Sequence, residues 1–298
     1  MADAGPGLRH GHHHRGRPQR GPAPAESDPM SVAELNTAHE MVLDIRKLRL
    51  ETVADRRVLI PNLDLTIRRG EIVGLVGQSG SGKTLTCFAV GGLVPQGVRV
   101  AGGEIHLEGR RIDNLAEAEW RAVRGGRIGM VFQDPLSSFN PVKTVGSILI
   151  ESARRHRGLD KAAARALAVE TLRAMRLPGA DACVDAFPHQ LSGGQRQRAM
   201  IGLALINQPA LILADEPTTA LDPTVQLQIL ALLRRQAQQA AALMITHDIA
   251  AAGAVCDRIA VMLEGEIVEE GPTAQVLYEP RHPFTRSLRD AAHLGRRA

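Results

Sequence analysis

The sequence contains few aromatic residues. One Trp, one Tyr and five Phe make up 2% of its 298 residues, whereas 44% of the residues are hydrophobic and 23% are charged. This is the composition of a globular protein whose core is built from Leu, Ile, Val, Ala and Met. No Phe, Tyr or Trp precedes Phe88, so the chain before that residue offers no aromatic ring on which a ligand could stack.

Long hydrophobic runs are also missing. A membrane-spanning helix needs about 20 consecutive apolar residues, and the longest uncharged run, residues 199–214, is interrupted by Asn207, Gln208 and Pro209. The first 30 residues contain no apolar segment of the kind found in a signal peptide. We therefore expect a chain that does not span a membrane and stays in the cytoplasm.

Cysteine is scarce and dispersed. Cys87, Cys183 and Cys256 lie far apart, and no two of them have CxxC spacing. This spacing predicts neither a disulfide framework nor a cysteine metal site, and it favours three buried thiols.

Most of the net positive charge lies at the N-terminus. The chain carries 36 Lys and Arg against 32 Asp and Glu, a net charge of +4, and residues 1–24 carry four Arg against the single acid Asp3, a net charge of +3. Gly and Pro are frequent there and apolar residues are rare, so burial cannot offset the entropy lost on ordering. We predict that residues 1–38 form a disordered basic Gly/Pro/His tail. His10 and the His run at residues 12–14 are weak candidates for a metal site, but a solvated tail is the favoured interpretation.

The hydrophobic pattern predicts an α/β fold. Residues 41–45 and 63–67 alternate apolar and polar side chains, as paired strands do. Continuous apolar runs, typical of strands buried on both faces, occupy residues 72–76, 211–214 and 242–246. Helical patterns cover residues 153–175, 196–206 and 224–240, and two short strands follow at residues 259–263 and 266–268. Strands that alternate with helices in this way predict a parallel sheet with crossover helices.

A phosphate-binding loop follows the first buried strand. The segment matches the pattern GxxxxGK[ST] at every fixed position, and it consists of Gly77, Gln78, Ser79, Gly80, Ser81, Gly82, Lys83 and Thr84. Glycines let the backbone curl so that N–H groups and the start of the next helix point at a phosphate. Lys83 supplies a cation for the outer phosphates and Thr84 a hydroxyl oxygen for Mg²⁺. The motif therefore predicts a nucleotide site.

An acidic pair ends the second buried strand. Asp215 directly follows the apolar run at residues 211–214, and Glu216 comes next. In P-loop ATPases an acid in this place orients Mg²⁺, and an adjacent carboxylate can polarise the attacking water. Alone, such a pair would more often be a solvated turn. Together with the phosphate loop, it marks Asp215 as a candidate metal ligand and Glu216 as a candidate general base.

Further motifs resemble those of the ATP-binding cassette (ABC) proteins. Residues 191–195, Leu-Ser-Gly-Gly-Gln, are similar to the signature motif of that family. Gln133 resembles its glutamine loop, residues 220–222 its aspartate loop and His247 its switch histidine, and all of them occur in the order of the family. The resemblance covers about residues 40–275. In the signature and the aspartate loop it points to Ser192, Gly193, Gly194, Gln195 and Asp222 as nucleotide-binding residues.

The resemblance implies a fold and a domain organisation. The fold is α/β, with a P-loop ATPase core that contains a parallel sheet, an antiparallel β subdomain and an inserted helical subdomain. We expect an ABC ATPase domain at residues 39–275, with the helical subdomain at about 136–199. Residues 276–298 are expected to form a short C-terminal extension.

The resemblance also implies a mechanism with ATP and Mg²⁺. In similar proteins two ATPase domains pack head to tail, and each ATP lies between the phosphate loop of one domain and the signature of the other. Glu216 would then act as base and His247 would stabilise the γ-phosphate geometry. Thr84, Gln133 and Asp215 would contact Mg²⁺, and the loop after Gln133 would report the nucleotide state to a membrane partner.

One position departs from the family pattern. The family usually stacks adenine on an aromatic residue upstream of the phosphate loop, and this chain has none. Arg57 and Val58 are candidates for a substitute contact, through guanidinium stacking or apolar cover. We expect weaker base discrimination as a result.

Two segments resemble the peptide and nickel importer branch of the family, namely residues 133–141 and residues 282–285. Residues 85–87, 97–99 and 285–288, and the lack of a Cys after Cys256, look most like the nickel-import ATP-binding proteins, and this resemblance implies nickel, free or chelated, as the cargo; di- or oligopeptides are the alternative. The implied partners are two membrane permease subunits, an extracytoplasmic substrate-binding protein and a second ATPase subunit. A heterodimer is favoured, a homodimer stays open, and the expected location is the cytoplasmic face of the inner membrane, as a peripheral subunit.

A soluble ABC ATPase of DNA repair or translation is the alternative of another class. Such proteins need long coiled-coil insertions or two cassettes, whereas this sequence has one cassette and no sustained heptads. The Arg residues of the tail lack interleaved aromatics, so we expect no nucleic-acid partner.

Overall fold

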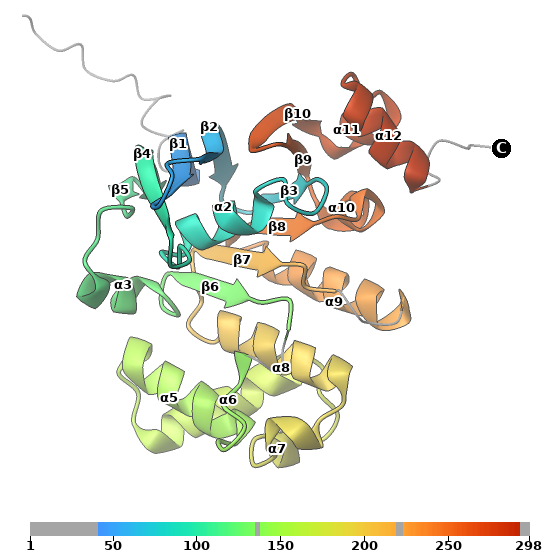
Figure 1. Cartoon of the computed structure of the whole chain (residues 1–298). Helices are drawn as coiled ribbons and strands as arrows, with labels where there is room; N and C mark the ends of the chain where they lie inside the picture. Colours follow the sequence, from blue (N-terminus) through green and yellow to red (C-terminus); the bar gives the residue numbers. More distant parts are fainter. Residues whose placement is uncertain (1–40, 135–137, 219–222, 293–298) are drawn as a thin grey trace, which may run out of the picture.

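The computed structural model describes residues 41–134, 138–218 and 223–292 (Figure 1). The predicted tail at residues 1–38 and the aspartate-loop residue Asp222 therefore lie outside the described residues. Within the described residues, no helix has the length and apolar character that crossing a membrane would require.

A four-stranded antiparallel sheet in the order β2-β1-β4-β5 forms one layer. Its strands are β1 (Met41–Thr52), β2 (Val58–Arg68), β4 (Val98–Leu107) and β5 (Arg110–Arg111). The predicted pairing of residues 41–45 with 63–67 is confirmed, since Ile45 lies opposite Leu65. Alternate side chains of β2, among them Leu63, Leu65 and Ile67, are buried, because a strand with one face on the core buries every second residue.

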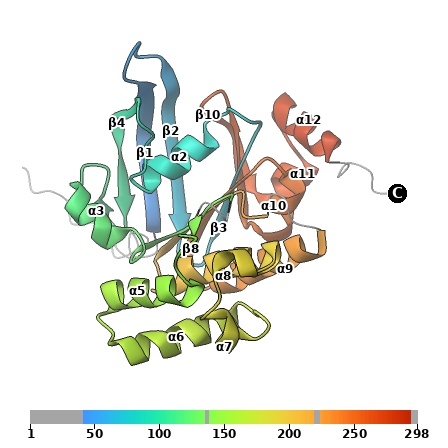
Figure 2. The ribbon, with the colours of Figure 1, turned by 60° about the horizontal axis from the view of Figure 1, so that its bottom comes forward.

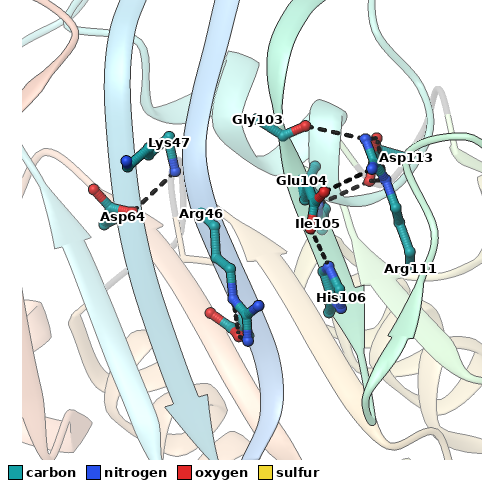
Figure 3. Close-up of polar contacts among 10 residues, drawn as sticks. Arg46, Lys47, Asp64, Gly103, Glu104, Ile105, His106, Arg111 and Asp113 are labelled. Atoms are coloured by element: carbon teal, nitrogen blue, oxygen red, sulfur yellow. Dashed lines mark hydrogen bonds and ion pairs between the residues drawn. The ribbon is translucent and has the colours of Figure 1, made fainter. Parts of the chain in front are cut away.

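Polar contacts support a bulge in this sheet (Figure 3). The register between β1 and β4 shifts between Arg46 and Arg49. Asp64 accepts a hydrogen bond from the Lys47 N–H at 2.9 Å. A side chain at Gly103 would place its Cβ 2.4 Å from the Lys47 carbonyl oxygen, and the positive φ of Gly103 also favours glycine. The bulge thus depends on a glycine and on a side chain that satisfies the N–H of the irregular residue.

The second sheet has six strands in the order β10-β9-β3-β8-β7-β6. Its strands are β3 (Ile72–Val76), β6 (Ile128–Val131), β7 (Leu211–Asp215), β8 (Ala241–Thr246), β9 (Arg258–Leu263) and β10 (Glu266–Pro272). All neighbours are parallel except β10, which runs antiparallel to β9. The expected α/β class, with a parallel sheet and a separate antiparallel unit, is confirmed.

Apolar clusters cover both faces of the six-stranded sheet. Ile72 and Val76 of β3 belong to one cluster and Val73 and Leu75 to the other, so all of β3 is buried. The first cluster includes side chains of α8 (Gly193–Leu205) and α9 (Pro223–Gln236). The second lies against the antiparallel sheet and includes side chains of α2 (Lys83–Val90) and α3 (Glu117–Val123). Continuous apolar strands are therefore the expected sequence pattern here.

Three helices gather at the end of the molecule away from the antiparallel sheet (Figure 2). They are α5 (Val145–Arg157), α6 (Lys161–Ala174) and the short α7 (Ala180–Cys183), and a 3₁₀ turn at Pro188–Gln190 leads on to α8. The prediction of one helix over residues 153–175 is wrong, because the chain breaks between α5 and α6. Gly158 ends α5 in the left-handed conformation, and the Asp160 carboxylate caps the first turn of α6. The expected boundaries 136–199 of a helical subdomain stay a prediction.

The C-terminal helices pack against the core. They are α10 (Ile249–Val255), α11 (Thr273–Tyr278) and α12 (Pro283–Ala291). Val276 and Leu277 of α11 are buried, and Phe284 and Leu288 of α12 contact the same apolar cluster. In Figure 1, α12 lies next to α11 at the end of the chain. The described part of the expected C-terminal extension is thus folded onto the apolar core that covers one face of the six-stranded sheet.

Candidate functional site

The predicted phosphate loop connects the end of β3 to the start of α2. Gly80 and Gly82 have positive φ values of 82° and 105°, a backbone region that glycine adopts without strain. Gly77 is needed for a different reason, since an added Cβ would lie 2.2 Å from the Met262 carbonyl oxygen of β9. The loop therefore wraps tightly around the N-terminal end of α2, where N–H groups are free to bind an anion.

Lys83 fills the curve of this loop. Its Nζ donates hydrogen bonds to the carbonyl oxygens of Gly77 (2.8 Å) and Gln78 (2.7 Å), and lies 3.3 Å from Ser81 Oγ. The residue is only 5% exposed. Burial lowers the pKa of Lys83, and the charges of Glu216 and Asp215 oppose that shift. The ammonium group is thus held at the centre of the predicted phosphate site.

Thr84 and Asp215 meet although they are far apart in the sequence. Thr84 Oγ1 donates to Asp215 Oδ1 at 3.3 Å. Asp215 is buried at the end of β7, and burial raises the pKa of its carboxyl group, with the Glu216 charge acting in the same direction and Thr84 and Lys83 opposing. The contact is possible because β3 and β7 both pair with β8 in parallel, so their carboxyl ends lie at one edge of the sheet.

Glu216 is the centre of a second set of contacts at the same edge. Gln133, which follows β6, donates from Nε2 to Glu216 Oε2 at 3.3 Å. His247, which follows β8, lies with Nδ1 2.9 Å from Glu216 Oε1. Glu216 itself has a positive φ of 46°, which is uncommon for a side chain with a Cβ and is found at functional sites. Two predicted residues, Gln133 and His247, thus converge from two other strand ends on the Glu216 carboxylate.

A cavity of about 710 Å³ is lined both by the phosphate loop and by the residues around Glu216. Its lining includes the loop residues Gly77 to Gly80 and Gly82 to Thr84, and the predicted residues Gln133, Glu216 and His247. Leu85 and Leu288 complete the lining. Of the described residues that line this cavity, none is Phe, Tyr or Trp, and neither Arg57 nor Val58 is among them. The substitute base contacts expected from the sequence are therefore not found in the lining.

The signature residues lie elsewhere on the surface. Ser192 caps α8, where Ser192 Oγ accepts from the Gln195 N–H at 3.3 Å and Gln195 Oε1 accepts from the Ser192 N–H at 2.8 Å. Ser192 and Gly193 are exposed, and among the described residues outside its own helix turn and chain neighbours, no atom lies within 4 Å of a Cβ built on Gly193. None of residues 192–195 lines the cavity of the phosphate loop. The chain thus presents a capped helix start with two exposed residues, Ser192 and Gly193.

Comparison with known families identifies the family of this chain. The family described as "ABC transporter" matches residues 60–219. The chain belongs to the ABC transporter family. The match includes the phosphate loop, Gln133, the signature and the acidic pair, and it ends before His247 and the C-terminal helices. Members of this family that bind ATP hydrolyse it to drive transport, so this ABC protein is an ATPase.

Relatives of this ABC ATPase are named for peptide transport. It is 43% identical to the "Probable D,D-dipeptide transport ATP-binding protein DdpD" of Escherichia coli K12, and 41% identical to the "Oligopeptide transport ATP-binding protein OppD" of Haemophilus influenzae. Each alignment covers 84% of this chain and 78% of the relative. The "Glutathione import ATP-binding protein GsiA" of Salmonella typhimurium is 43% identical over 77% of this chain and 38% of GsiA. The expected peptide and nickel importer branch is confirmed.

A solved structure supports the fold of the ABC ATPase. The ATP-binding cassette MJ0796, solved as a dimer in a post-hydrolysis state with ADP and Pi, superposes with a TM-score of 0.68 at 29% identity. The superposition covers 78% of this chain and 98% of MJ0796. The expected ABC ATPase fold is therefore confirmed.

Leu85 and Leu288 line the cavity, but the sequence does not predict them as site residues. Leu85 directly follows Thr84, and a helical Leu there is an ordinary core residue by pattern. Leu288 lies on α12, far along the chain, and only the packing of that helix brings it to the cavity. No local sequence pattern indicates that Leu288 lines this cavity, because it lies far along the chain from the other lining residues.

Proposed function

We propose that this chain is the ATP-hydrolysing subunit that energises an ABC importer of short peptides. The observation that carries the proposal is the single cavity in which the phosphate loop, Gln133, Glu216 and His247 meet. The names of the relatives supply the class of cargo.

ATP binding begins at the phosphate loop. The backbone N–H groups at the start of α2 and the buried Lys83 ammonium provide the positive potential that the phosphates need. We propose that Lys83 exchanges its contacts with the Gly77 and Gln78 carbonyls for oxygens of the outer phosphates. The residues from Gly77 to Thr84 would then form the phosphate half of the site.

The residues around Thr84 fit Mg²⁺. A hydroxyl and a carboxylate 3.3 Å apart supply the hard oxygen ligands that this ion prefers, and Gln133 has an amide oxygen at the same cavity. Burial raises the pKa of Asp215, and a cation bound beside it would favour the charged carboxylate. Thr84, Asp215 and Gln133 are therefore the residues that would hold Mg²⁺. When bound, the ion would neutralise charge on the phosphates.

Glu216 is the proposed general base. Its carboxylate is oriented by the Gln133 amide and by His247, so it can accept a proton from a water molecule with little rearrangement. His247 is proposed to stabilise the γ-phosphate geometry, and its contact with Glu216 fixes the orientation of the ring.

The signature is proposed to act on a second ATPase subunit. Ser192, Gly193, Gly194 and Gln195 lie outside the cavity of their own chain, and Ser192 and Gly193 are exposed, which suits a phosphate presented by another subunit. MJ0796 has been solved as a dimer. Asp222 is proposed to contribute to the same interface. The partner is a different ATPase subunit in the favoured arrangement and a second copy in the other.

The remaining partners follow from an importer. We propose two membrane permease subunits and an extracytoplasmic substrate-binding protein, with this chain at the cytoplasmic face of the inner membrane. A role of the protein in DNA repair or translation is not favoured, because the relatives named above are transport and import proteins.

Peptides are the proposed cargo in place of nickel. The sequence favoured nickel on short segments such as residues 85–87, whereas the relatives named above carry dipeptide, oligopeptide and glutathione in their names. Because an ATPase subunit does not contact the cargo, homology is a better guide here than any feature of the site.

The test combines two variants with two cargoes. In cells that express the complete transporter, deletion of this subunit should abolish uptake of labelled di- and oligopeptides and leave ⁶³Ni²⁺ uptake unchanged. Glu216→Gln should retain ATP binding and lose turnover by about 100-fold or more, whereas Lys83→Ala should lose ATP binding. Loss of nickel uptake alone would refute the peptide cargo, and normal turnover of Glu216→Gln would refute its role as base.

A further inference from the structure

We propose that Leu288 contacts the bound nucleotide, so that the C-terminal helix α12 forms one wall of the ATP site. The inference rests on the proposed function of the cavity. It adds a binding residue from outside the family match, which ends at residue 219.

Leu288 belongs to the cavity lining together with the phosphate loop, Glu216 and His247. The other described lining residues are glycines or carry amide, hydroxyl, ammonium, carboxylate or imidazole groups, with the exception of Leu85. An aliphatic side chain cannot donate a hydrogen bond to a phosphate. Its contribution must be apolar cover of the nucleotide and exclusion of water from the edge of the cavity.

The helix that carries Leu288 is held firmly at its start. Glu269 of β10 accepts hydrogen bonds from the N–H groups of Arg281 (2.8 Å) and His282 (2.9 Å). His282 caps the helix, since its Nδ1 accepts from the Phe284 N–H at 3.2 Å. Arg286 donates from Nε to the Pro280 carbonyl oxygen at 3.1 Å. These contacts fix the entry of α12.

One face of α12 then lies on the core. Thr285 is fully buried, and Phe284 and Leu288 pack against the apolar cluster that covers one face of the six-stranded sheet. Leu288 is only partly buried, so some of its surface remains available to a ligand. A side chain held in place before binding loses little entropy when the nucleotide arrives, which makes such a contact favourable.

The experiment compares nucleotide affinity in variants of the full chain. Fluorescent ADP, titrated into purified protein, should bind Leu288→Ala about threefold to tenfold more weakly than the natural chain, because apolar cover is lost. Leu288→Asp should bind more than about tenfold more weakly, since it removes the apolar cover and adds a negative charge to a cavity that is to hold an anionic nucleotide. Leu288→Met, which keeps an apolar side chain of similar size, should bind within about twofold of the natural chain.

Ser287→Asp is the matched control. Ser287 precedes Leu288 on the same helix, is exposed and is not among the residues that line the cavity. It should change the affinity by less than about twofold, because an exposed charge outside the cavity is screened by solvent. Thermal unfolding without nucleotide checks that each variant is folded, and Leu288→Ala carries the test if the Asp variant is not.

The outcomes separate this inference from the proposed function. Loss of binding in Lys83→Ala together with unchanged affinity in Leu288→Ala and Leu288→Asp would overturn the role of Leu288 alone. Tighter binding by Leu288→Ala would also overturn it, since the side chain would then obstruct the site. Normal binding by Lys83→Ala would instead refute the nucleotide site itself.

Discussion

Gln197 of α8 donates a hydrogen bond from its side-chain nitrogen to the carbonyl oxygen of Pro217, the residue directly after Glu216. The Gln197 side chain is buried, with the residue 2% exposed. The same helix begins at the signature residue Ser192. One buried hydrogen bond therefore connects the signature helix of this chain to its own proposed hydrolysis site. A displacement of α8 should therefore also move the backbone next to Glu216.

Replacing Gln197 by Leu should remove the coupling between α8 and the backbone next to Glu216. The change leaves the Pro217 carbonyl oxygen without its buried donor, which costs about 1–3 kcal/mol of unfolding free energy. We expect ATPase turnover to fall about tenfold because Glu216 loses its fixed backbone, while ATP affinity changes by less than about twofold. Urea unfolding and steady-state kinetics measure both effects. Gln96→Ala, at an exposed glutamine, is the control, and unchanged turnover in Gln197→Leu would contradict the coupling.

Gly77→Ala should disrupt the phosphate loop. Its Cβ would lie 2.2 Å from the backbone carbonyl oxygen of Met262, and backbone in a buried strand cannot move aside. We expect ATP affinity to fall by about 100-fold or more, because the loop N–H groups lose their common direction. Calorimetric titration with ATP measures the change. If Gly77→Ala retained normal ATP affinity, the loop would be able to accommodate the added Cβ, and the steric argument would be wrong.

Gly193→Ala should behave in the opposite way. In the described part of the chain, apart from its own helix turn and chain neighbours, no atom lies within 4 Å of the added Cβ, so thermal stability and ATP binding by the isolated chain should not change. In the assembled transporter, the methyl group would keep a phosphate from the backbone at the start of α8, and ATPase activity should fall about tenfold or more. If the assembled transporter retained full activity with this variant, the signature would not act across a subunit interface.

Some parts of the fold and of the site could be predicted from the sequence, and others could not. The phosphate loop and the Asp215-Glu216 pair were predictable, because each is a contiguous pattern at the end of an apolar strand. The break between α5 and α6 had local signals in Gly158 and Asp160, but dense Ala and Leu residues favoured one long helix. Gln197 and Leu288 were not predictable, since a buried amide and a leucine on a helix face acquire their roles only through tertiary packing.

GTP should compete with ATP more effectively than in ATPases that stack the base on an aromatic ring. None of the described residues that line the cavity is Phe, Tyr or Trp, so the site lacks the stacking of the base on such a ring, which is worth about 1–3 kcal/mol. We expect the dissociation constants of GTP and ATP to differ by less than about tenfold. Competition against a fluorescent nucleotide gives the ratio. An ATP preference of about 100-fold or more would show that another group reads the base.

Glu269→Gln should loosen α12 in a way that depends on pH. Burial acts to raise the pKa of Glu269, but the hydrogen bonds it accepts, including those from the Arg281 and His282 N–H groups, hold that pKa below its ordinary value of 4.5. A depressed pKa means that the charged form stabilises the fold, so the contribution is complete above pH 4.5 and is lost as the pH falls through the lower, folded-state pKa.

We therefore expect the free energy of unfolding of Glu269→Gln to lie about 1 kcal/mol below that of the natural chain at pH 7, and the two values to converge as the pH falls through the folded-state pKa of Glu269. Hydrogen exchange at pH 7 should increase over Pro283–Ala291 in the variant, since two backbone N–H groups lose a charged acceptor. Glu279→Gln removes the same charge from an exposed residue near the helix and should leave both measurements unchanged. A difference in unfolding free energy that persisted in acid would show that the exchange of a carboxyl oxygen for an amide NH₂ group, and not the loss of charge, causes the effect.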